Sequence, residues 1–247
     1  VRREDEQIVF DFEQLSHVAK QLVRILDNSV EISAKNAVND SNIILSKRRI
    51  GIGVCGAADL LIELGLQYDS SLARDLMADI IAVINYYSKE ASVALAQVRG
   101  AFPLFNESRY KDKDWTMRKG QKPTEHVNLL MWEKLWQKIS SVGLRNSETT
   151  AMPPTGNSSR LVGASSSIEP RFDLSGTFHQ VSADGQLAMV KVAQEHIDGS
   201  ISKTFNLPNE TTVTEIDSLL KKCYQAGLKG VTIFRDKCLN ERAIIKT

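Results

Sequence analysis

The sequence lacks a dominant charge, a long apolar run and an apolar leader. Its 31 basic and 30 acidic residues leave a formal net charge of +1, which gives no field for nucleic acid or for an anionic membrane. No apolar stretch approaches the length of a membrane span, and the first six residues, VRREDE, contain no signal core. We therefore expect a cytoplasmic protein with neither nucleic-acid nor membrane partners.

Cysteine and histidine are scarce. The three cysteines, Cys55, Cys223 and Cys238, are far apart and odd in number, and they form no CxxC or Cys/His spacing. A reducing compartment is the simplest setting for such thiols, and we expect Cys55 to be a buried structural thiol. The four histidines share no ligand spacing either. The sequence therefore predicts no metal site.

Length and composition allow a sizeable core. The 247 residues are 42% hydrophobic and 25% charged, enough for one large α/β domain or for part of a bigger one. Apolar spacing predicts a short strand over residues 7–10 and helices over residues 11–30, 57–64, 70–99, 128–140, 179–198 and 214–227. Residues 35–46 and 111–122 are expected to be irregular, with Trp115 exposed. Asp27 and Asn28 could equally be a solvated helix end, and no catalytic role is predicted for them.

Residues 151–170, AMPPTGNSSRLVGASSSIEP, form the segment most expected to touch a ligand. A buried strand over residues 148–152 stops at Pro153 and Pro154, small polar residues follow, and a short helix is predicted from about Arg160. Such a turn into a helix leaves backbone N–H groups unpaired beside a positive dipole end, which suits phosphate. The same residues equally suit an ordinary capped turn, because Thr, Ser and Asn are favoured caps.

Three glycines, Gly51, Gly53 and Gly56, have the GxGxxG spacing of a dinucleotide-binding turn. That reading needs a preceding strand, for which residues 43–45 (IIL) are the candidate, and a second strand ending in an acidic residue roughly twenty positions later. The chain instead runs past Gly65 into another long helix. Close backbone packing in a barrel is the alternative, and a Rossmann-type oxidoreductase that binds NAD stays open.

Several segments resemble the large subunit of the ribonucleotide reductases. TTAMPPTGNSS (149–159) and SSIEP (166–170) resemble its substrate-phosphate loop, and RRIGIGVCGAADLL (48–61) resembles another segment of its barrel. The resemblance covers nearly all 247 residues but only the C-terminal half of the family's ten-stranded α/β barrel. It implies amide donors at Gly156, Asn157 and Ser158 and hydroxyl donors at Thr155 and Ser158. The predicted phosphate-binding residues are Thr155, Gly156, Asn157, Ser158 and Ser159.

Residues 200–208 and 230–236 are predicted to be closing strands of that barrel, because they alternate as barrel strands do. Reductases that receive their radical from a separate metal subunit carry two adjacent tyrosines where this chain has Thr232 and Ile233. The strand therefore resembles the adenosylcobalamin-dependent class, or else an inactive relative in which the tyrosines were replaced. Lys203 is a tempting phosphate partner, but it is expected to be solvated.

The family's chemistry needs a radical cysteine within Asn-x-Cys-x-Glu and two reducing cysteines. The sequence contains no Asn-x-Cys-x-Glu, so no catalytic residue is predicted. We expect residues 1–247 to form one piece of a split reductase, because half a barrel leaves open sheet edges. A Cys-bearing N-terminal chain would complete this hetero-oligomer, which would bind adenosylcobalamin and a ribonucleotide and accept electrons from a thioredoxin-like or glutaredoxin-like protein. The alternative is a non-catalytic nucleotide-binding or regulatory relative.

Overall fold

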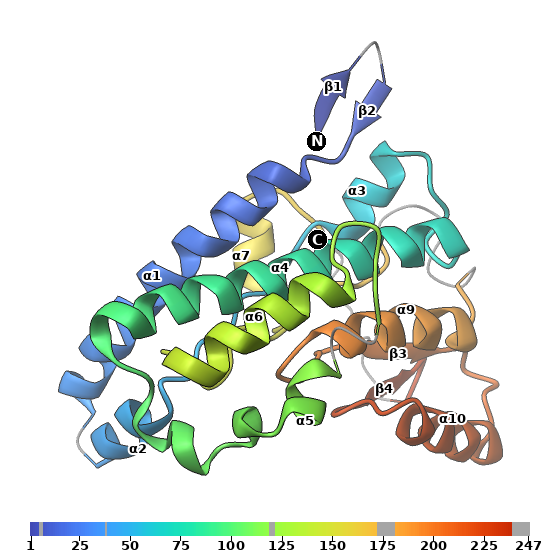
Figure 1. Ribbon diagram of the computed structural model, residues 1–247. Helices are drawn as coiled ribbons and strands as arrows, with labels where there is room; N and C mark the ends of the chain where they lie inside the picture. The colour runs from blue at the N-terminus through green and yellow to red at the C-terminus, as the bar shows by residue number, and fades with distance from the viewer. Residues whose placement is uncertain (5–6, 38, 119–121, 172–180, 239–247) are drawn as a thin grey trace. The chain divides into compact units, whose positions relative to one another are not determined.

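The computed structural model describes residues 1–4, 7–37, 39–118, 122–171 and 181–238 (Figure 1). The chain divides into two compact units. Unit 1 comprises residues 1–52, 78–151 and 195–199, and unit 2 comprises residues 53–77, 152–194 and 200–247. No described helix has the length and apolarity needed to cross a membrane.

Unit 1 is mainly helical. It opens with the antiparallel pair β1 and β2, whose register joins Arg2 to Val9. The Asp11 carboxylate caps α1 by accepting from Gln14 N–H at 2.9 Å, and the Asn128 side chain caps α6 in the same way. Its elements are β1 (Arg2–Glu4), β2 (Gln7–Val9), α1 (Phe12–Asn36), α2 (Ser41–Lys47), α4 (Ser71–Arg99) from residue 78 onward, η1 (Pro103–Glu107), η2 (Arg109–Lys111), α5 (Lys113–Met117) and α6 (Leu129–Val142).

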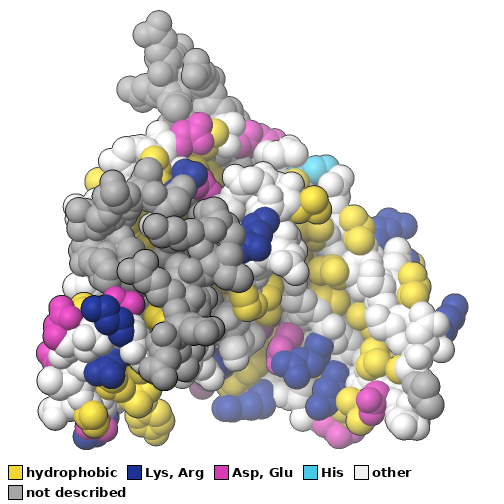
Figure 2. Space-filling view, turned by 180° about the vertical axis from the view of Figure 1, so that it is seen from behind, with side chains coloured by type: hydrophobic (Ala, Val, Ile, Leu, Met, Phe, Trp, Pro, Cys, Tyr) yellow, Lys and Arg dark blue, Asp and Glu magenta, His cyan; other side chains and the backbone are white. Residues whose placement is uncertain are grey.

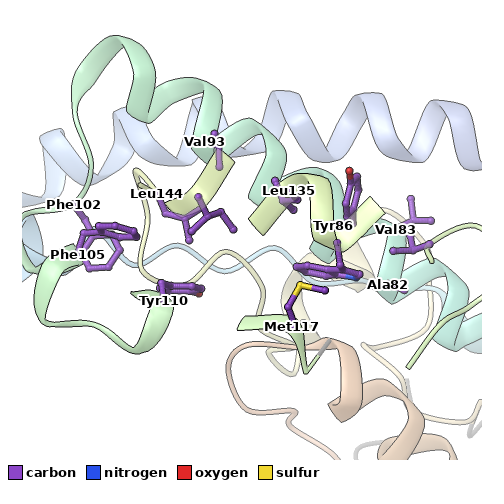
Figure 3. Packing of buried hydrophobic residues seen from close by; sticks show 13 residues of the cluster. Ala82, Val83, Tyr86, Val93, Phe102, Phe105, Tyr110, Met117, Leu135 and Leu144 are labelled. Carbon is purple, nitrogen blue, oxygen red and sulfur yellow. The ribbon is translucent and has the colours of Figure 1, made fainter. Parts of the chain in front are cut away.

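The core of unit 1 lies where α4, α6 and the 3₁₀ segments η1 and η2 meet (Figure 3). Tyr86 of α4 packs edge-to-face on Trp132 of α6, with ring centroids 5.6 Å apart. Phe102 and Phe105 make a second edge-to-face pair, also at 5.6 Å. Phe12 from α1 packs against the same cluster. Aromatic pairs of this geometry add to the stabilisation that apolar burial provides.

Unit 2 contains a parallel strand pair joined by a helix. β3 and β4 pair in parallel, with Thr204 opposite Thr232 and Leu207 opposite Arg235, and α10 makes the crossover. Thr212 and Glu215 form a capping box at the start of α10. The elements of unit 2 are α3 (Ala57–Glu63), the first residues of α4, α7 (Gly156–Leu161), α9 (Ala183–His196) to residue 194, β3 (Thr204–Leu207), α10 (Val213–Gln225) and β4 (Thr232–Arg235).

The predicted strand over residues 148–152 is extended and makes isolated parallel bridges. Within unit 1 Ile52 pairs with Thr150, and within unit 2 Met152 pairs with Ile201. A Cβ added at Gly51 would lie 2.9 Å from the Cβ of Ala151. This spacing is closer than real side chains tolerate, so Gly51 serves close backbone packing, as one reading of the glycine motif predicted.

Several predicted elements are confirmed, among them the helices α3, α4, α6 and α10 and the strands β2 and β4. Residues 35–46, predicted to be irregular, include the start of α2, and α1 runs on to Asn36. Residues 43–45, the candidate strand, are helical. The predicted helix over residues 179–198 is observed from Ala183, and residues 179–180 lie outside the described part.

The charged segment 111–122 is not irregular throughout, contrary to the prediction. It contains α5, because the Asp112 carboxylate accepts from Trp115 N–H at 3.1 Å and caps the helix. Trp115 is half-buried and packs edge-to-face on Tyr110, with centroids 5.1 Å apart. On the face drawn in Figure 2, described basic and acidic side chains lie in small mixed groups, in keeping with the net charge of +1.

Candidate functional site

The predicted phosphate loop turns into a helix earlier than the sequence indicated. α7 begins at Gly156 and not at about Arg160, because Thr155 takes a left-handed conformation with φ 55° and turns the chain directly into the helix. No described residue accepts a hydrogen bond from the N–H groups of Gly156, Asn157 or Ser158. These residues are exposed. Three consecutive amide donors thus face outward where the resemblance implied them.

The five predicted site residues differ in what their own groups contact. The Thr155 hydroxyl oxygen accepts from Ser167 N–H at 2.7 Å, which leaves its proton available to a ligand. Ser159 is buried, its N–H donates to the Thr155 carbonyl at 2.7 Å, and its hydroxyl lies 3.0 Å from that of Ser166. Both donors of Ser159 are therefore used inside the loop.

The return limb of the loop, residues 163–170, is anchored to α3 and to the segment after it. Ser165 N–H donates to the Asp59 carboxylate at 2.5 Å, and Gly56 N–H donates to the Ser165 carbonyl at 2.7 Å. The Tyr68 hydroxyl donates to the Ile168 carbonyl at 2.5 Å. Burial, with the charges of Glu169 and Asp69, raises the pKa of Tyr68 well above its usual value, so Tyr68 keeps the proton that it donates.

These contacts also bear on the two readings of the glycine motif, dinucleotide binding and close backbone packing. Gly56, in the left-handed region at φ 78°, packs against Ala164 of the loop. The required strand before the motif is absent, because residues 43–45 belong to α2. The NAD-binding alternative is therefore wrong, and the glycines serve backbone packing.

Lys203 is buried, contrary to the prediction that it is solvated. Its side chain is 1% exposed, and its ammonium lies 2.7 Å from Glu169 Oε2. The same nitrogen donates to Gln186 Oε1 at 2.8 Å and to the Thr204 carbonyl at 2.5 Å. Burial lowers the pKa of Lys203, while the Glu169 carboxylate works against that shift. Two of the three ammonium donors are therefore used, by Gln186 and the Thr204 carbonyl, while Glu169 Oε2 balances the charge as an ion-pair partner and accepts no hydrogen bond from the described residues.

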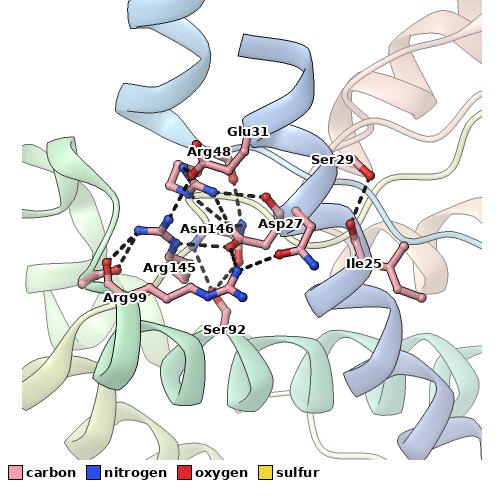
Figure 4. A network of polar contacts seen from close by, with 11 residues as sticks. Ile25, Asp27, Ser29, Glu31, Arg48, Ser92, Arg99, Arg145 and Asn146 are labelled. Carbon is pink, nitrogen blue, oxygen red and sulfur yellow. Dashed lines mark hydrogen bonds and ion pairs between the residues drawn. The ribbon is translucent and has the colours of Figure 1, made fainter. Parts of the chain in front are cut away.

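Asp27 is the centre of a polar network in unit 1 (Figure 4), so the solvated helix end, one of the two readings left open for it, is wrong. Its side chain is 0% exposed. Arg48 donates to Oδ1 from Nε at 3.0 Å and from Nη2 at 2.8 Å, and Arg145 and Asn146 donate as well. Burial alone would raise the pKa of Asp27, but the hydrogen bonds and charges of Arg48, Arg145 and Asn146 outweigh it and hold that pKa below normal.

The cysteines are unpaired thiols. Cys55 is exposed, so its predicted burial is wrong. It lies in the bend immediately before Gly56. Cys223 on α10 is buried, and that burial raises the pKa of its thiol. Cys238 is exposed. None of the described cysteines therefore forms a disulfide.

The structure also brings together a group that sequence spacing did not reveal. Ligand-type atoms of Asp79, Glu125 and His126 lie within 4.8 Å of one another. The Asp79 carboxylate accepts from His126 N–H at 3.0 Å and lies 3.1 Å from His126 Nδ1. The ring of His126 stacks on Phe12 at 3.7 Å. Hydrogen bonding and stacking account for this arrangement without a metal ion.

Comparison with known proteins shows which family the chain belongs to. The family model "Ribonucleotide reductase, barrel domain" matches residues 2–177 and 173–234. The chain is 26% identical over 280 residues to a vitamin B12-dependent ribonucleoside-diphosphate reductase of Mycobacterium tuberculosis, a match that covers 91% of this chain and 36% of the relative. It is 27% identical over 282 residues to the enzyme of that name from Thermoplasma acidophilum, covering 92% of this chain and 33% of the relative.

A third relative carries a different name. The ribonucleoside-diphosphate reductase subunit alpha of Buchnera aphidicola subsp. Baizongia pistaciae is 28% identical over 220 residues, covering 87% of this chain and 29% of the relative. The chain thus spans about a third of the length of the curated relatives it matches. It belongs to the ribonucleotide reductase family and forms part of the barrel domain, so the α/β fold predicted from the sequence is confirmed.

Proposed function

We propose that this chain is part of a ribonucleotide reductase that converts ribonucleotides to deoxyribonucleotides, and that residues 155–158 hold the substrate's phosphates. Family membership supports the reaction, since the relatives are named ribonucleoside-diphosphate reductases. One observation carries the site: the N–H groups of Gly156, Asn157 and Ser158 point out of the turn at Thr155 without a partner among the described residues.

The loop is suited to an anion. Three amide donors beside the positive end of a helix dipole bind phosphate oxygens without charged side chains. The hydroxyls of Thr155 and Ser158 add two donors at the edges of this group. Ser159 is predicted to contribute indirectly, because both of its donors are used within the loop. The substrate's phosphates would thereby be fixed while its ribose is presented to chemistry elsewhere.

The reducing chemistry is proposed to lie on a partner chain. Replacing the ribose 2′ hydroxyl by hydrogen releases water and consumes two electrons and two protons, which two thiols supply as they are oxidised to a disulfide. The sequence has three cysteines, none within Asn-x-Cys-x-Glu. We propose that a Cys-bearing chain supplies the radical and reducing thiols in a hetero-oligomer, and that a thioredoxin-like or glutaredoxin-like protein reduces the disulfide again.

Adenosylcobalamin is proposed as the cofactor of the assembled enzyme. The names of two relatives support this, as does the pair Thr232 and Ile233, neither of which can carry a radical by side-chain oxidation. Two surface hollows among the described residues, one along α1 and one beside η1, hold about 450 and 330 Å³, and neither of these two is of corrinoid size.

Reconstitution tests the proposal. The chain is mixed with a Cys-bearing reductase chain, a reducing system and a ribonucleoside diphosphate or triphosphate, and deoxyribonucleotide is measured with and without adenosylcobalamin. Product that depends on both this chain and adenosylcobalamin is expected. A stable complex that binds nucleotide but forms no product would instead support a non-catalytic nucleotide-binding relative, which the missing Asn-x-Cys-x-Glu in these residues also favours.

A further inference from the structure

We infer that the buried pair formed by Lys203 and Glu169 positions the phosphate loop, so that both are positioning residues for the phosphate site; this inference rests on the proposed function. Glu169 is the last residue but one of the loop (residues 151–170), and Lys203 immediately precedes β3. Both belong to unit 2. The pair therefore fastens the end of the loop to the strand.

The attachment uses both oxygens of the Glu169 carboxylate. Oε2 lies 2.7 Å from the Lys203 ammonium, and Oε1 accepts from Thr204 N–H at 2.8 Å. The side chains of Lys203 and Glu169 are 1% and 13% exposed. Because little water competes, this two-point attachment fixes where the loop ends more firmly than a surface ion pair would.

Lys203 acts through Glu169 and not on phosphate itself. Its ammonium donates to Gln186 Oε1 and to the Thr204 carbonyl, and its charge pairs with Glu169 Oε2. A direct phosphate contact would require Lys203 to give up one of these bonds inside a buried site, which is costly. Its positive charge is balanced by the carboxylate next to it.

A short path links this attachment to the amide donors. Ile168 precedes Glu169 in the chain, and its carbonyl accepts a hydrogen bond from the Tyr68 hydroxyl. Ser167 precedes Ile168. Ser167 is itself held in the left-handed region at φ 48°, and its N–H donates to the Thr155 hydroxyl at 2.7 Å. Thr155 sets the direction of the N–H groups that follow it. A shift at Glu169 therefore reaches the proposed site within a few bonds.

A sequence pattern supports the buried position of Lys203. Side chains two residues apart on a strand share a face, and Phe205 and Leu207 are both buried. Lys203 lies at the same phase, with its ammonium 5.4 Å from the Phe205 ring centroid. A lysine on this apolar face without a carboxylate opposite it would be strongly unfavourable, so its presence is explained by its partner.

Removing one member of a buried ion pair destabilises a protein, whereas replacing both members is often close to neutral. The double variant Lys203→Met/Glu169→Gln is therefore the informative one. The amide side chain that replaces the carboxylate would keep an oxygen for Thr204 N–H, so the fold is expected to survive while the charged attachment is lost. Lys222→Met is the matched control, because Lys222 pairs at 2.7 Å with Asp184 in the same unit but on the surface.

The test is the affinity of the 247-residue chain for inorganic pyrophosphate, measured by calorimetry well below each variant's melting temperature. We expect the double variant to bind at least about tenfold more weakly although its melting temperature stays near that of the wild type, and Lys222→Met to bind within about twofold of it. Unchanged affinity in a folded double variant would overturn the inference alone, provided that Ser158→Ala weakens binding. Two results would overturn the proposed site and the inference together. One is that the wild type does not bind pyrophosphate, and the other is that Ser158→Ala binds it with unchanged affinity.

Discussion

Replacement of Asp27 by asparagine removes the buried carboxylate on which Arg48, Arg145 and Asn146 converge. Asp27 and Arg48 are 0% and 3% exposed, and their closest atoms are 2.8 Å apart. Removing one charge of a buried pair typically costs about 3–5 kcal/mol, because the other charge stays buried without compensation. In a chain of this size each kcal/mol lowers Tm by about 2–4 °C. We therefore expect Asp27→Asn to lose roughly 6–20 °C.

The assay is urea and thermal unfolding followed by circular dichroism, with Asp40→Asn as the matched control. Asp40 lies exposed before α2 and makes no side-chain cap bond there, so its replacement is expected to change the free energy of unfolding by no more than about 0.5 kcal/mol. The reasoning is refuted if the two variants unfold within about 1 kcal/mol of each other. That outcome would mean that Glu31, which also accepts from Arg48 at 2.7 Å, compensates the Arg48 charge when the Asp27 carboxylate is lost.

Three further predictions follow from individual contacts. The folded pKa of Asp27 lies below its unfolded value of 3.8, so the Asp27 carboxylate contributes its full stability above pH 3.8 and loses it as the pH falls through the folded pKa. When the free energy of unfolding is measured against pH, wild type and Asp27→Asn should therefore converge at the acid end of that range. Ser167→Gly should raise stability by about 0.5–1 kcal/mol in urea unfolding, because it relieves a left-handed conformation and removes a buried hydroxyl that has no partner among the described residues. Gly51→Ala should lower it by about 1–3 kcal/mol in the same assay, because the new methyl would lie 2.9 Å from the Ala151 Cβ.

Much of the helical framework could be predicted from the sequence, because long helices with strong apolar periodicity identify themselves. α4 and α6 were found for that reason. α2 was missed because the run Ile43-Ile44-Leu45 is too short to distinguish a strand from a helix by pattern alone. The predicted start of α7 was too late because the helix begins directly after Thr155, which is in the left-handed conformation. That conformation is uncommon for a residue other than glycine, so the sequence does not indicate it.

The candidate site was less accessible to sequence reasoning. Residues 155–159 are consecutive in the chain, so their resemblance to a known phosphate-binding loop was enough to predict them as one site. The buried network around Asp27 could not, because its partners Arg48 and Arg145 are 21 and 118 residues away along the chain. Lys203 was judged from its charge, although its phase with Phe205 placed it on the buried face. Long-range charge pairing is set by tertiary packing, which no local pattern contains.

The most direct test of the central claim is the KM for the ribonucleotide in the assembled enzyme with Ser158→Ala. Ser158 is exposed at the predicted phosphate site, and losing one hydrogen bond to a charged group costs about 1.5–3 kcal/mol. The account predicts a KM raised roughly 10-fold to 150-fold, with Ser141→Ala, an exposed serine on α6, as the unchanged control. A KM in Ser158→Ala equal to that of the control would contradict the assignment of this loop to the substrate's phosphates.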